Sequence, residues 1–386
     1  MDSCDVLIVG GGPAGSSCAW QLTEAGLDAV VVDRSAFPRD KVCAGWITPQ
    51  VVDQLQLDCD HYRRGRTLQP ITGFRTGLVG GDRDIETRYG RTVSFGIRRC
   101  EFDHYLLTRS RARLRLGTSI ASIRRERGRW IINDSISAPL LVGAGGHFCP
   151  VARRLNSTTD RRSLVAAREA EFPISRGDDR WLANAETPEL YYCRDLRGYG
   201  WSFRKGNYLN VGLGRLDARS LPDACARFVA FLQERGRVPR DASWRWRGHA
   251  YLVCVPPHRR IVDDGVMLIG DAAGLAYAQS GEGIRPAIES GLLAAAAIAG
   301  ARRLDTADAV VTYAKALRER CGIDSGASRP RRALLPDLSS TFGPWLLGRS
   351  WFVRHFVLDR WFLHARDVAL PHRAKTRPYF AALSRS

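Results

Sequence analysis

A glycine-rich turn near the N-terminus has residue types and a spacing suited to binding a dinucleotide. It follows an apolar run, residues 6–9, and leads into a helical pattern that stops before Gly26. The first glycine permits a sharp turn, the second lets the backbone approach a pyrophosphate, and the third lets helix and strand pack closely. The start of the helix would offer N–H groups and the positive end of its dipole to phosphates. The turn consists of Gly10, Gly12, Pro13, Ala14 and Gly15.

A carboxylate stands at the matching position after the next strand. Residues 29–32 form a second apolar run that ends in Asp33, about 20 residues past the glycines, where an acid would meet an adenosine ribose hydroxyl. Strand, turn, helix and acid together predict a dinucleotide site, and the alternative is a purely structural glycine turn. The polar residues 34–45 that follow contain Pro38 and Gly45 and are expected to form a loop.

Two later apolar runs also end at glycines, and an aspartate follows the second. Residues 140–143 lead into Gly145 and Gly146, and residues 265–269 lead into Gly270 and Asp271. Asp271 could simply cap the next helix, a common role for aspartate. That helix is expected to begin after Gly281 and Gly283, at Ile284, and to run through Ala299.

The middle of the chain has the patterns of an antiparallel sheet. Residues 113–142 suggest a hairpin that turns at Gly128. Further strands are predicted at residues 163–172, 189–193, 199–213 and 246–254, with an amphipathic helix near 221–235. The strand aromatics are either ordinary core residues or the wall of a substrate pocket. They are Tyr191, Tyr192, Tyr199, Trp201 and Phe203.

The composition is that of a large globular protein with a strong positive charge. The 386 residues can bury an extensive core, and 58 basic against 40 acidic residues give a net charge of +18. This favours anionic partners such as a phosphorylated cofactor or lipid, an anionic membrane surface or nucleic acid. Because the arginines are scattered and no nucleic-acid-binding motif occurs, we expect no specific nucleic-acid partner.

The cysteines and the apolar segments indicate the compartment. Ten cysteines without CxxC pairs suggest reduced thiols and neither a disulfide framework nor a metal site. The chain starts on a core strand without signal-peptide features, and no run of about 18 apolar residues lacks charges. We therefore expect a cytoplasmic monomer or small homo-oligomer. The Trp- and Arg-rich tail, residues 342–386, either packs as helices on the protein or contacts the inner face of the membrane peripherally.

Several motifs resemble the FAD-dependent oxidoreductases of the aromatic-hydroxylase superfamily, over roughly residues 4–300. They are the glycine turn, the RxxFD segment that starts at Arg99, and the strand end at Gly270-Asp271. Within that superfamily the chain looks most like the geranylgeranyl reductase family, because residues 37–43 (FPRDKVC) and 199–206 (YGWSFRKG) are similar to two of its motifs. There are two departures. Arg204 stands where the family has proline, and Gly145 stands where the superfamily has an aspartate associated with cofactor and nicotinamide handling.

The resemblance implies a fold class and a domain organisation. The fold would be α/β, with a Rossmann-like FAD-binding fold, an inserted antiparallel substrate sheet and a helical C-terminal tail. The expected domains are residues 1–160 together with 255–305 for FAD, 161–254 for substrate, and 306–386 for the helical region. No second glycine fingerprint indicates a separate NADPH domain, so NADPH or a protein electron donor is expected to act as a transient reductant.

The resemblance also assigns roles to residues. Tyr199, Trp201 and Phe203 would line the pocket of a lipophilic substrate, and Asp271 and the helix after Gly283 would contact the flavin. Besides the glycine turn, the residues assigned to FAD are Asp33, Arg34, Lys41, Cys43, Ala44, Arg99, Gly270, Asp271, Gly281, Gly283 and Ile284.

The predicted reaction is the reduction of isoprenoid C=C bonds by hydride transfer from reduced FAD. An isolated alkene accepts hydride poorly, so a proton donor is needed nearby, and Cys43 is the candidate. Its alternative role is that of an inert thiol. The rival activity is an FAD-dependent monooxygenase that hydroxylates or halogenates an aromatic substrate. A third alternative is a flavin- or lipid-binding protein without turnover, or a tRNA-associated flavoprotein.

Overall fold

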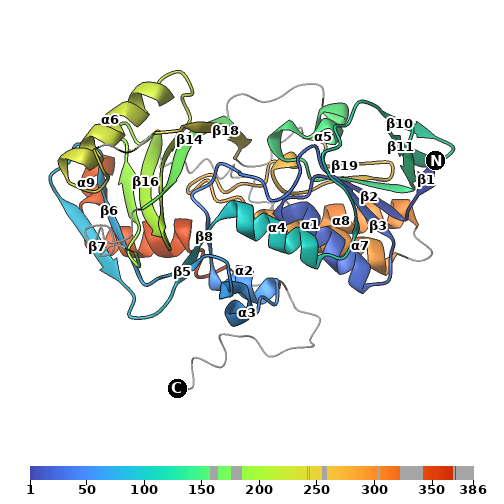
Figure 1. Cartoon of the computed structure of the whole chain (residues 1–386), viewed down its shortest axis with the longest axis horizontal. Coiled ribbons are helices and arrows are strands. Elements are labelled where there is room, and N and C mark those ends of the chain that lie inside the picture. The colour runs from blue at the N-terminus through green and yellow to red at the C-terminus, as the bar shows by residue number, and fades with distance from the viewer. Residues whose placement is uncertain are drawn as a thin grey trace. The chain divides into compact units, whose positions relative to one another are not determined.

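The computed structural model describes residues 1–156, 164–174, 185–240, 242, 244–253, 259–301, 305–321, 342–367 and 370. The chain divides into two compact units. The first contains residues 1–40, 100–163 and 251–331, and the second contains residues 41–99, 164–250 and 332–386. Figure 1 labels many of the elements of both units.

A largely parallel sheet forms the centre of the first unit. Its strand order is β19-β20-β13-β2-β3-β9, and every neighbouring pair is parallel except β19 and β20. The central strands are uniformly apolar and buried on both faces, as expected for a parallel sheet. The bounds are β2 (Val6–Val9), β3 (Ala29–Val32), β9 (Arg113–Arg115), β13 (Leu140–Gly143), β19 (Val262–Asp263) and β20 (Val266–Leu268).

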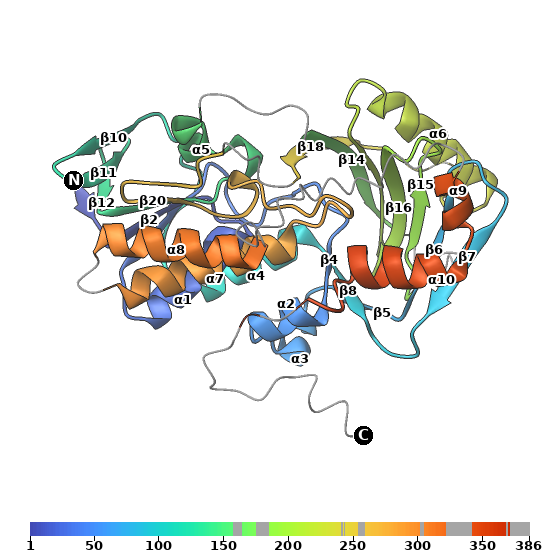
Figure 2. The same ribbon diagram turned by 180° about the vertical axis from the view of Figure 1, so that it is seen from behind.

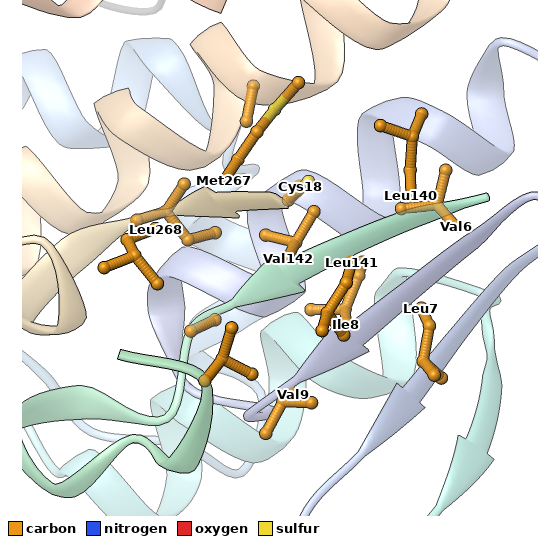
Figure 3. Packing of buried hydrophobic residues seen from close by; sticks show 14 of the residues in the cluster. Val6, Leu7, Ile8, Val9, Cys18, Leu140, Leu141, Val142, Met267 and Leu268 are labelled. Atoms are coloured by element: carbon orange, nitrogen blue, oxygen red, sulfur yellow. The ribbon is translucent and has the colours of Figure 1, made fainter. Parts of the chain in front are cut away.

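Three helices pack in the core of this unit. They are α1 (Pro13–Glu24), α7 (Ile284–Gly300) and α8 (Thr306–Cys321), and Figure 2 shows α7 and α8 side by side. Gly291 of α7 lets that helix pack against α1, because a Cβ atom there would overlap with the backbone of Ala14. The Tyr313 hydroxyl of α8 donates to the carbonyl oxygen of Leu268 at 2.6 Å. Figure 3 shows the buried strand side chains of this core.

Other described elements of the first unit are helix α4 (Arg99–Arg109), a small mixed sheet and short helical segments. Strands β1 (Asp2–Ser3), β12 (Ile136–Ala138), β11 (Arg129–Ile132) and β10 (Ile123–Glu126) pair in that order. The predicted hairpin turn at Gly128 is confirmed, with a φ angle of 77° between β10 and β11. The short segments are η1 (Gly146–Phe148), α5 (Pro150–Leu155) and η4 (Gly270–Ala272).

A seven-stranded, mostly antiparallel sheet dominates the second unit. Its order is β18-β14-β17-β16-β15-β6-β7; β14, β17, β16 and β15 pair antiparallel in turn, β15 and β6 pair in parallel, and β6 and β7 pair antiparallel. Sequence analysis treated residues 199–213 as a single stretch, whereas the chain turns at Gly206, with a φ angle of 58°, between two strands. The bounds are β6 (Gly73–Leu78), β7 (Asp84–Arg88), β14 (Leu164–Pro173), β15 (Glu189–Tyr192), β16 (Gly198–Lys205), β17 (Tyr208–Arg215) and β18 (Arg247–Leu252).

The two faces of this sheet differ in chemistry. One face packs on α6 (Leu221–Glu234), close to the helix predicted at 221–235, through a core that includes Tyr191, Val211 and Phe228. The other face carries large aromatic residues together with charged ones. Strand register places Trp201 opposite Gly212 and Gly212 opposite Glu169 on this second face.

The remaining elements of the second unit include a three-stranded sheet and helices. Strands β4 (Trp46–Ile47), β8 (Ser94–Ile97) and β5 (Leu68–Ile71) pair in that order, and α2 (Pro49–Gln54) and α3 (Cys59–Arg63) lie near them in the chain. The described tail forms α9 (Phe342–Leu347), α10 (Ser350–Phe352) and the π-helical η6 (Val353–Phe362). Tail residues 368–369 and 371–386 lie outside the described residues.

The fold confirms the predicted class, an α/β nucleotide-binding fold with an antiparallel sheet and a helical C-terminal region. The two compact units group the chain differently from the three predicted domains, whose boundaries stay a prediction. Residues 41–99 belong to the unit of the antiparallel sheet because β6 and β7 extend that sheet. Helix α8 belongs to the first unit because Tyr313 binds β20. No described helix has the length and apolar character needed to cross a bilayer.

Candidate active site

The glycine turn leaves space at the N-terminus of α1. Gly12 precedes the helix and, lacking a side chain, makes no side-chain cap. Among the described residues, a Cβ atom on Gly12 would have only the Nη2 atom of Arg39 within contact distance, at 3.5 Å. In contrast, a Cβ on Gly10 would overlap with Ala144, and a Cβ on Gly15 would overlap with Gly10. The turn is therefore closely packed everywhere except where a phosphate would approach the helix.

The predicted acid is fixed beside this turn. Asp33 follows β3, and its Oδ2 atom accepts the N–H of Gly11 at 2.8 Å. Its Oδ1 atom accepts the N–H of Ser35 at 2.8 Å. Parallel strands β2 and β3 end at the same edge of the sheet, so the acid and the turn meet there. Arg34 is exposed next to Asp33.

An ion pair that sequence analysis did not assign lies at the same helix start. The Nη1 atom of Arg39 is 3.2 Å from Oδ2 of Asp103, whose side chain is fully buried. Asp103 is the acid of the RxxFD segment and lies in α4 (Arg99–Arg109). Because a planar guanidinium suits a phosphate, Arg39 is a candidate phosphate ligand held in place by Asp103. The burial of Asp103 requires a cationic partner, and nothing in the local sequence identifies Arg39 as that partner.

The later cofactor segments also come together. A Cβ atom on Gly283 would lie 3.0 Å from Oδ1 of Asp271, so this carboxyl group is at the start of α7. Gly270 and Gly281 adopt φ angles of 59° and 67°, and Ile284 is buried in the first turn of the helix. A carboxylate is favoured at a helix N-terminus. The structure therefore brings these predicted residues to one place without deciding between helix capping and flavin binding for Asp271.

Gly145, the departure from the superfamily motif, packs tightly. A Cβ atom there would lie 3.2 Å from the Cα atom and 3.3 Å from the Cβ atom of Cys149. Burial raises the pKa of the Cys149 thiol. An aspartate at position 145 would therefore require the buried Cys149 backbone to move.

The loop that contains the candidate catalyst lies in the second unit. The Cys43 N–H donates to Oε2 of Glu169 at 2.7 Å, and the Cys43 Sγ atom accepts the N–H of Gly45 at 3.3 Å. Lys41 Nζ lies 2.7 Å from Nε2 of His249. Ala44 is half-buried in the same loop. Arg99, at the start of α4, is buried. The flavin contacts predicted for Arg99, Lys41, Cys43 and Ala44 stay predictions.

Aromatic residues of the second unit form a continuous cluster on the sheet face opposite α6. Ring centroids lie 5.6 Å apart for Trp46 and Phe203, and 6.1 Å apart for Tyr199 and Trp201. Phe362 of η6 contacts both Trp46, at 5.4 Å, and Tyr199, at 5.3 Å. All three predicted substrate residues therefore belong to one apolar surface, to which the tail contributes Phe362.

A buried polar network lies on the same face. The Trp201 Nε1–H donates to Oδ1 of Asn210 at 2.7 Å, and the Asn210 amide donates to Oε2 of Glu169 at 3.3 Å and of Glu171 at 3.1 Å. Lys205 Nζ is 3.0 Å from Glu171 Oε2 and is buried. The network thus joins the Cys43 loop to Trp201. Sequence analysis missed Glu169, Glu171 and Asn210, because only the strand register places them beside Trp201.

The residues of the first unit fit an FAD. The open cradle at Gly12, with Arg39 beside it, would receive the diphosphate, and Asp33 would accept a ribose hydroxyl. Asp271 and the start of α7 would lie near the remainder of the cofactor.

Comparisons with known proteins agree with this geometry. A family model described as FAD dependent oxidoreductase matches residues 5–77. A menaquinone reductase of Mycobacterium tuberculosis is 30% identical over 373 residues, which cover 89% of this chain and 87% of that protein. A digeranylgeranylglycerophospholipid reductase of Methanothrix thermoacetophila is 30% identical over 342 residues, which cover 83% and 84%.

Solved structures share the fold. A geranylgeranyl bacteriochlorophyll reductase-like protein of Thermoplasma acidophilum superposes with a TM-score of 0.72 at 21% identity, over 90% of this chain and 91% of that one. A flavin-dependent brominase superposes with a TM-score of 0.69 at 14% identity, over 99% and 98%. At these identities the likeness concerns the fold alone. The matches to relatives over most of their length, together with the glycine turn and Asp33, show that the chain belongs to the geranylgeranyl reductase family of FAD-dependent oxidoreductases.

Proposed function

We propose that this protein reduces C=C double bonds of a polyprenyl chain by hydride transfer from reduced FAD. The main support is the chemistry shared by the substrates in the relatives' names. Menaquinone, digeranylgeranyl glycerophospholipids and geranylgeranyl diphosphate all carry polyprenyl chains, and the relatives named for them match most of this chain. The aromatic cluster around Trp201 and Phe203 supplies an apolar surface suited to such a chain.

The two units would divide the work of binding. Arg39 and the start of α1 would bind the FAD diphosphate, and the carboxylate of Asp33 would accept a hydrogen bond from a ribose hydroxyl. Bound FAD supplies hydride chemistry. Trp201, held by Asn210, would present its ring to the isoprenoid chain. The reductant of the flavin is proposed to be NADPH or a protein electron carrier that binds transiently.

The proposed substrate also suggests where the protein works. A polyprenyl lipid resides in a membrane, so we propose peripheral contact with the inner face of the membrane from a cytoplasmic position. Exposed aromatic residues in the C-terminal helices support this, since Phe342, Trp345 and Trp351 are 62%, 55% and 63% exposed. A net charge of +18 would favour an anionic bilayer.

An anaerobic experiment tests the activity. The purified flavoprotein is reduced without oxygen and mixed with geranylgeranyl diphosphate, a digeranylgeranyl lipid, menaquinone or simple aromatic compounds. Flavin reoxidation by a polyprenyl compound, with two hydrogens gained in the prenyl chain for each reduced bond, is the expected result, and reduction of the menaquinone ring alone does not count as such. An oxygen-dependent product that gains an oxygen atom would instead support a monooxygenase. A chain that neither contains nor accepts flavin would contradict both activities.

A further inference from the structure

Two carboxyl groups on the same face of β14 have opposite electrostatic environments. Burial alone would raise the pKa of Glu171, but the charge of Lys205 and hydrogen bonds from Lys205, Arg98 and Asn210 lower it to about 2. Burial raises the pKa of Glu169 to about 6, because the charge of Lys205 and the Cys43 N–H offset it only in part. Two neighbouring acids whose environments separate their pKa values in this way are a frequent basis of acid–base chemistry.

The hydrogen bonds of Glu169 leave one of its oxygens for a proton. Its Oε2 atom accepts both the Cys43 N–H, at 2.7 Å, and the Asn210 amide, at 3.3 Å. Among the described residues, none donates a hydrogen bond to Oε1. The side chain is 4% exposed, so an ionised Glu169 would have little water around it. A proton on Oε1 would remove this cost while both hydrogen bonds to Oε2 remain.

Glu169 also lies beside the surface assigned to the substrate. In the sheet it is directly opposite Gly212, and the Trp201 ring lies so close over Gly212 that a Cβ atom there would overlap with it. Asn210 connects the two side chains, since it accepts from Trp201 and donates to Glu169. The buried acid is therefore connected by hydrogen bonds to a predicted substrate residue and to the loop of Cys43.

We propose that Glu169 is the acid that supplies the proton in the reduction of the double bond. This rests on the proposed function. The π bond breaks as one carbon receives a hydride, with its electron pair, from the reduced flavin, and the neighbouring carbon receives the Oε1 proton. Two C–H bonds form, the flavin is oxidised by two electrons, and the Glu169 carboxylate regains a proton from water. Cys43 is then a positioning residue whose backbone N–H orients the acid.

The surrounding groups are consistent with this role. The titratable and charged groups around Glu169 are Glu171 on its own strand, Lys205 on β16 and Cys43 on the loop. Arg98 pairs with the Oε1 atom of Glu171. The adjacent strand β18 contributes His249, which is hydrogen-bonded to Lys41. Lys205 forms an ion pair with Glu171, with 3.0 Å between Nζ and Oε2. Ionisation of Glu169 should accordingly be centred near pH 6.

A titration that needs neither flavin nor substrate tests the acid itself. In protein labelled with 15N-cysteine, the Cys43 amide signal, identified by its loss in Cys43→Ser, is followed between pH 5 and pH 8. We expect this signal to shift with a midpoint near pH 6, because its acceptor ionises. The shift should vanish in Glu169→Gln and persist in Glu189→Gln. Glu189 is the matched control because it is a buried acid of the same sheet that pairs with Arg75 instead.

Single-turnover measurements test the catalytic role. With the flavin reduced in advance, Glu169→Gln should slow reoxidation by a polyprenyl substrate at least about 100-fold. The wild-type rate should fall as pH rises above 6, because the acid is then ionised, and the residual rate of Glu169→Gln should not follow this profile. FAD affinity should stay unchanged in Glu169→Gln, and Glu189→Gln should behave as wild type.

The outcomes separate the two proposals. Wild-type turnover that survives in Glu169→Gln, or a Cys43 amide that does not titrate near pH 6, would overturn the acid role while the reductase activity stands. Failure of every polyprenyl compound to reoxidise the wild-type flavin would remove the proposed function, and with it the acid role, even where the amide titrates. If Glu169→Gln does not fold, the wild-type pH profile decides, since a flat profile above pH 6 overturns the acid role.

Discussion

At the scale of single residues, position in the sheet decides what a glutamate does. Glu169 and Glu171 are two residues apart on one face of β14, yet only Glu171 lies within reach of both Lys205 and Arg98. The two cations keep Glu171 ionised. Because both of them pair with Glu171, the pKa of Glu169 stays high. The same side chain thus acts as a fixed charge at one position and as a titrating acid at the other.

The Glu171 ion pair predicts how stability depends on acid. The folded pKa of Glu171, about 2, lies below its ordinary value of 4.5, so its stabilisation is complete above pH 4.5 and is lost as pH falls toward 2. A shift of this size corresponds to about 3 kcal/mol. Glutamine at position 171 should remove that acid sensitivity and should lower the free energy of unfolding at pH 7 by about 3 kcal/mol, because Lys205 stays buried without its partner.

Urea unfolding followed by tryptophan fluorescence at several pH values measures this effect. Glu169 contributes in the opposite sense, because its raised pKa adds stability below pH 4.5 that is lost as pH rises through 6. The Glu171 effect falls below pH 4.5 and the Glu169 effect between pH 4.5 and pH 6, so one series of unfolding measurements across pH resolves both. Glu234→Gln, which changes an exposed acid of α6, is the control and should leave the profile unaltered. An unchanged acid slope in Glu171→Gln would show that the ion pair does not carry the sensitivity.

Residue types and local spacing were enough to predict that one group of candidate residues lies together. Asp33 and the glycines have roles that depend on a few neighbouring positions, and the structure places them together. Arg39 and Glu169 could not be assigned in this way. Arg39 depends on a partner in α4, and Glu169 depends on strand register that joins β14 to β17 across 40 residues of sequence. Contacts between distant segments of this kind carry no local signature.

At the scale of elements, periodicity predicted the helices and strands better than their interruptions. The glycine turn, α6 and the start of α7 agree with the sequence pattern. The turn at Gly206 was missed although Gly206 and Asn207, a typical hairpin pair, stand between the two apolar stretches. In the tail, the helix breaks at Gly348, and Trp345 before the break is exposed whereas Leu363 after it is buried.

The turn before α1 predicts a substitution that separates binding from folding. At Gly12 the φ angle is −74°, and a Cβ atom would contact only Arg39, so Gly12→Ala should change stability by less than about 0.5 kcal/mol. The added methyl group would occupy the space where the diphosphate approaches the helix. FAD affinity should therefore fall at least about tenfold, a cost of about 1.4 kcal/mol.

Titration of the apoprotein with FAD, read by quenching of flavin fluorescence, measures this affinity, and thermal unfolding measures stability. Gly300→Ala is the control, because a Cβ atom at the end of α7 would have no described atom within 4 Å. Gly15→Ala is the opposite case and should unfold the turn, since its Cβ would overlap with the backbone of Gly10. Normal FAD binding by Gly12→Ala would place the diphosphate elsewhere.

At the scale of the whole molecule, a net charge of +18 acts together with an exposed aromatic surface of the second unit. The buried side of the C-terminal helices is fixed to that unit by Phe362 and by the hydrogen bond from the Tyr89 hydroxyl to Asp359 at 2.6 Å. This leaves Trp345 and Trp351 outward, with the Arg349 guanidinium 4.5 Å from the Trp345 ring centroid. Tryptophan beside arginine is a combination that favours the interface of an anionic bilayer.

The proposed membrane contact predicts binding to vesicles in which both charge and aromatic rings matter. The protein should sediment with vesicles that contain anionic phospholipid, less so with neutral ones, and binding should weaken as salt rises, because the Debye length shrinks from about 10 Å at 0.1 M to about 3 Å at 1 M. Replacing Trp345 and Trp351 with alanine should weaken binding at least about tenfold, whereas Phe148→Ala, which removes an exposed aromatic of the first unit, should not. Equal binding of the double variant and wild type would mean that charge alone attracts the protein, and the two tryptophans would then not insert into the bilayer.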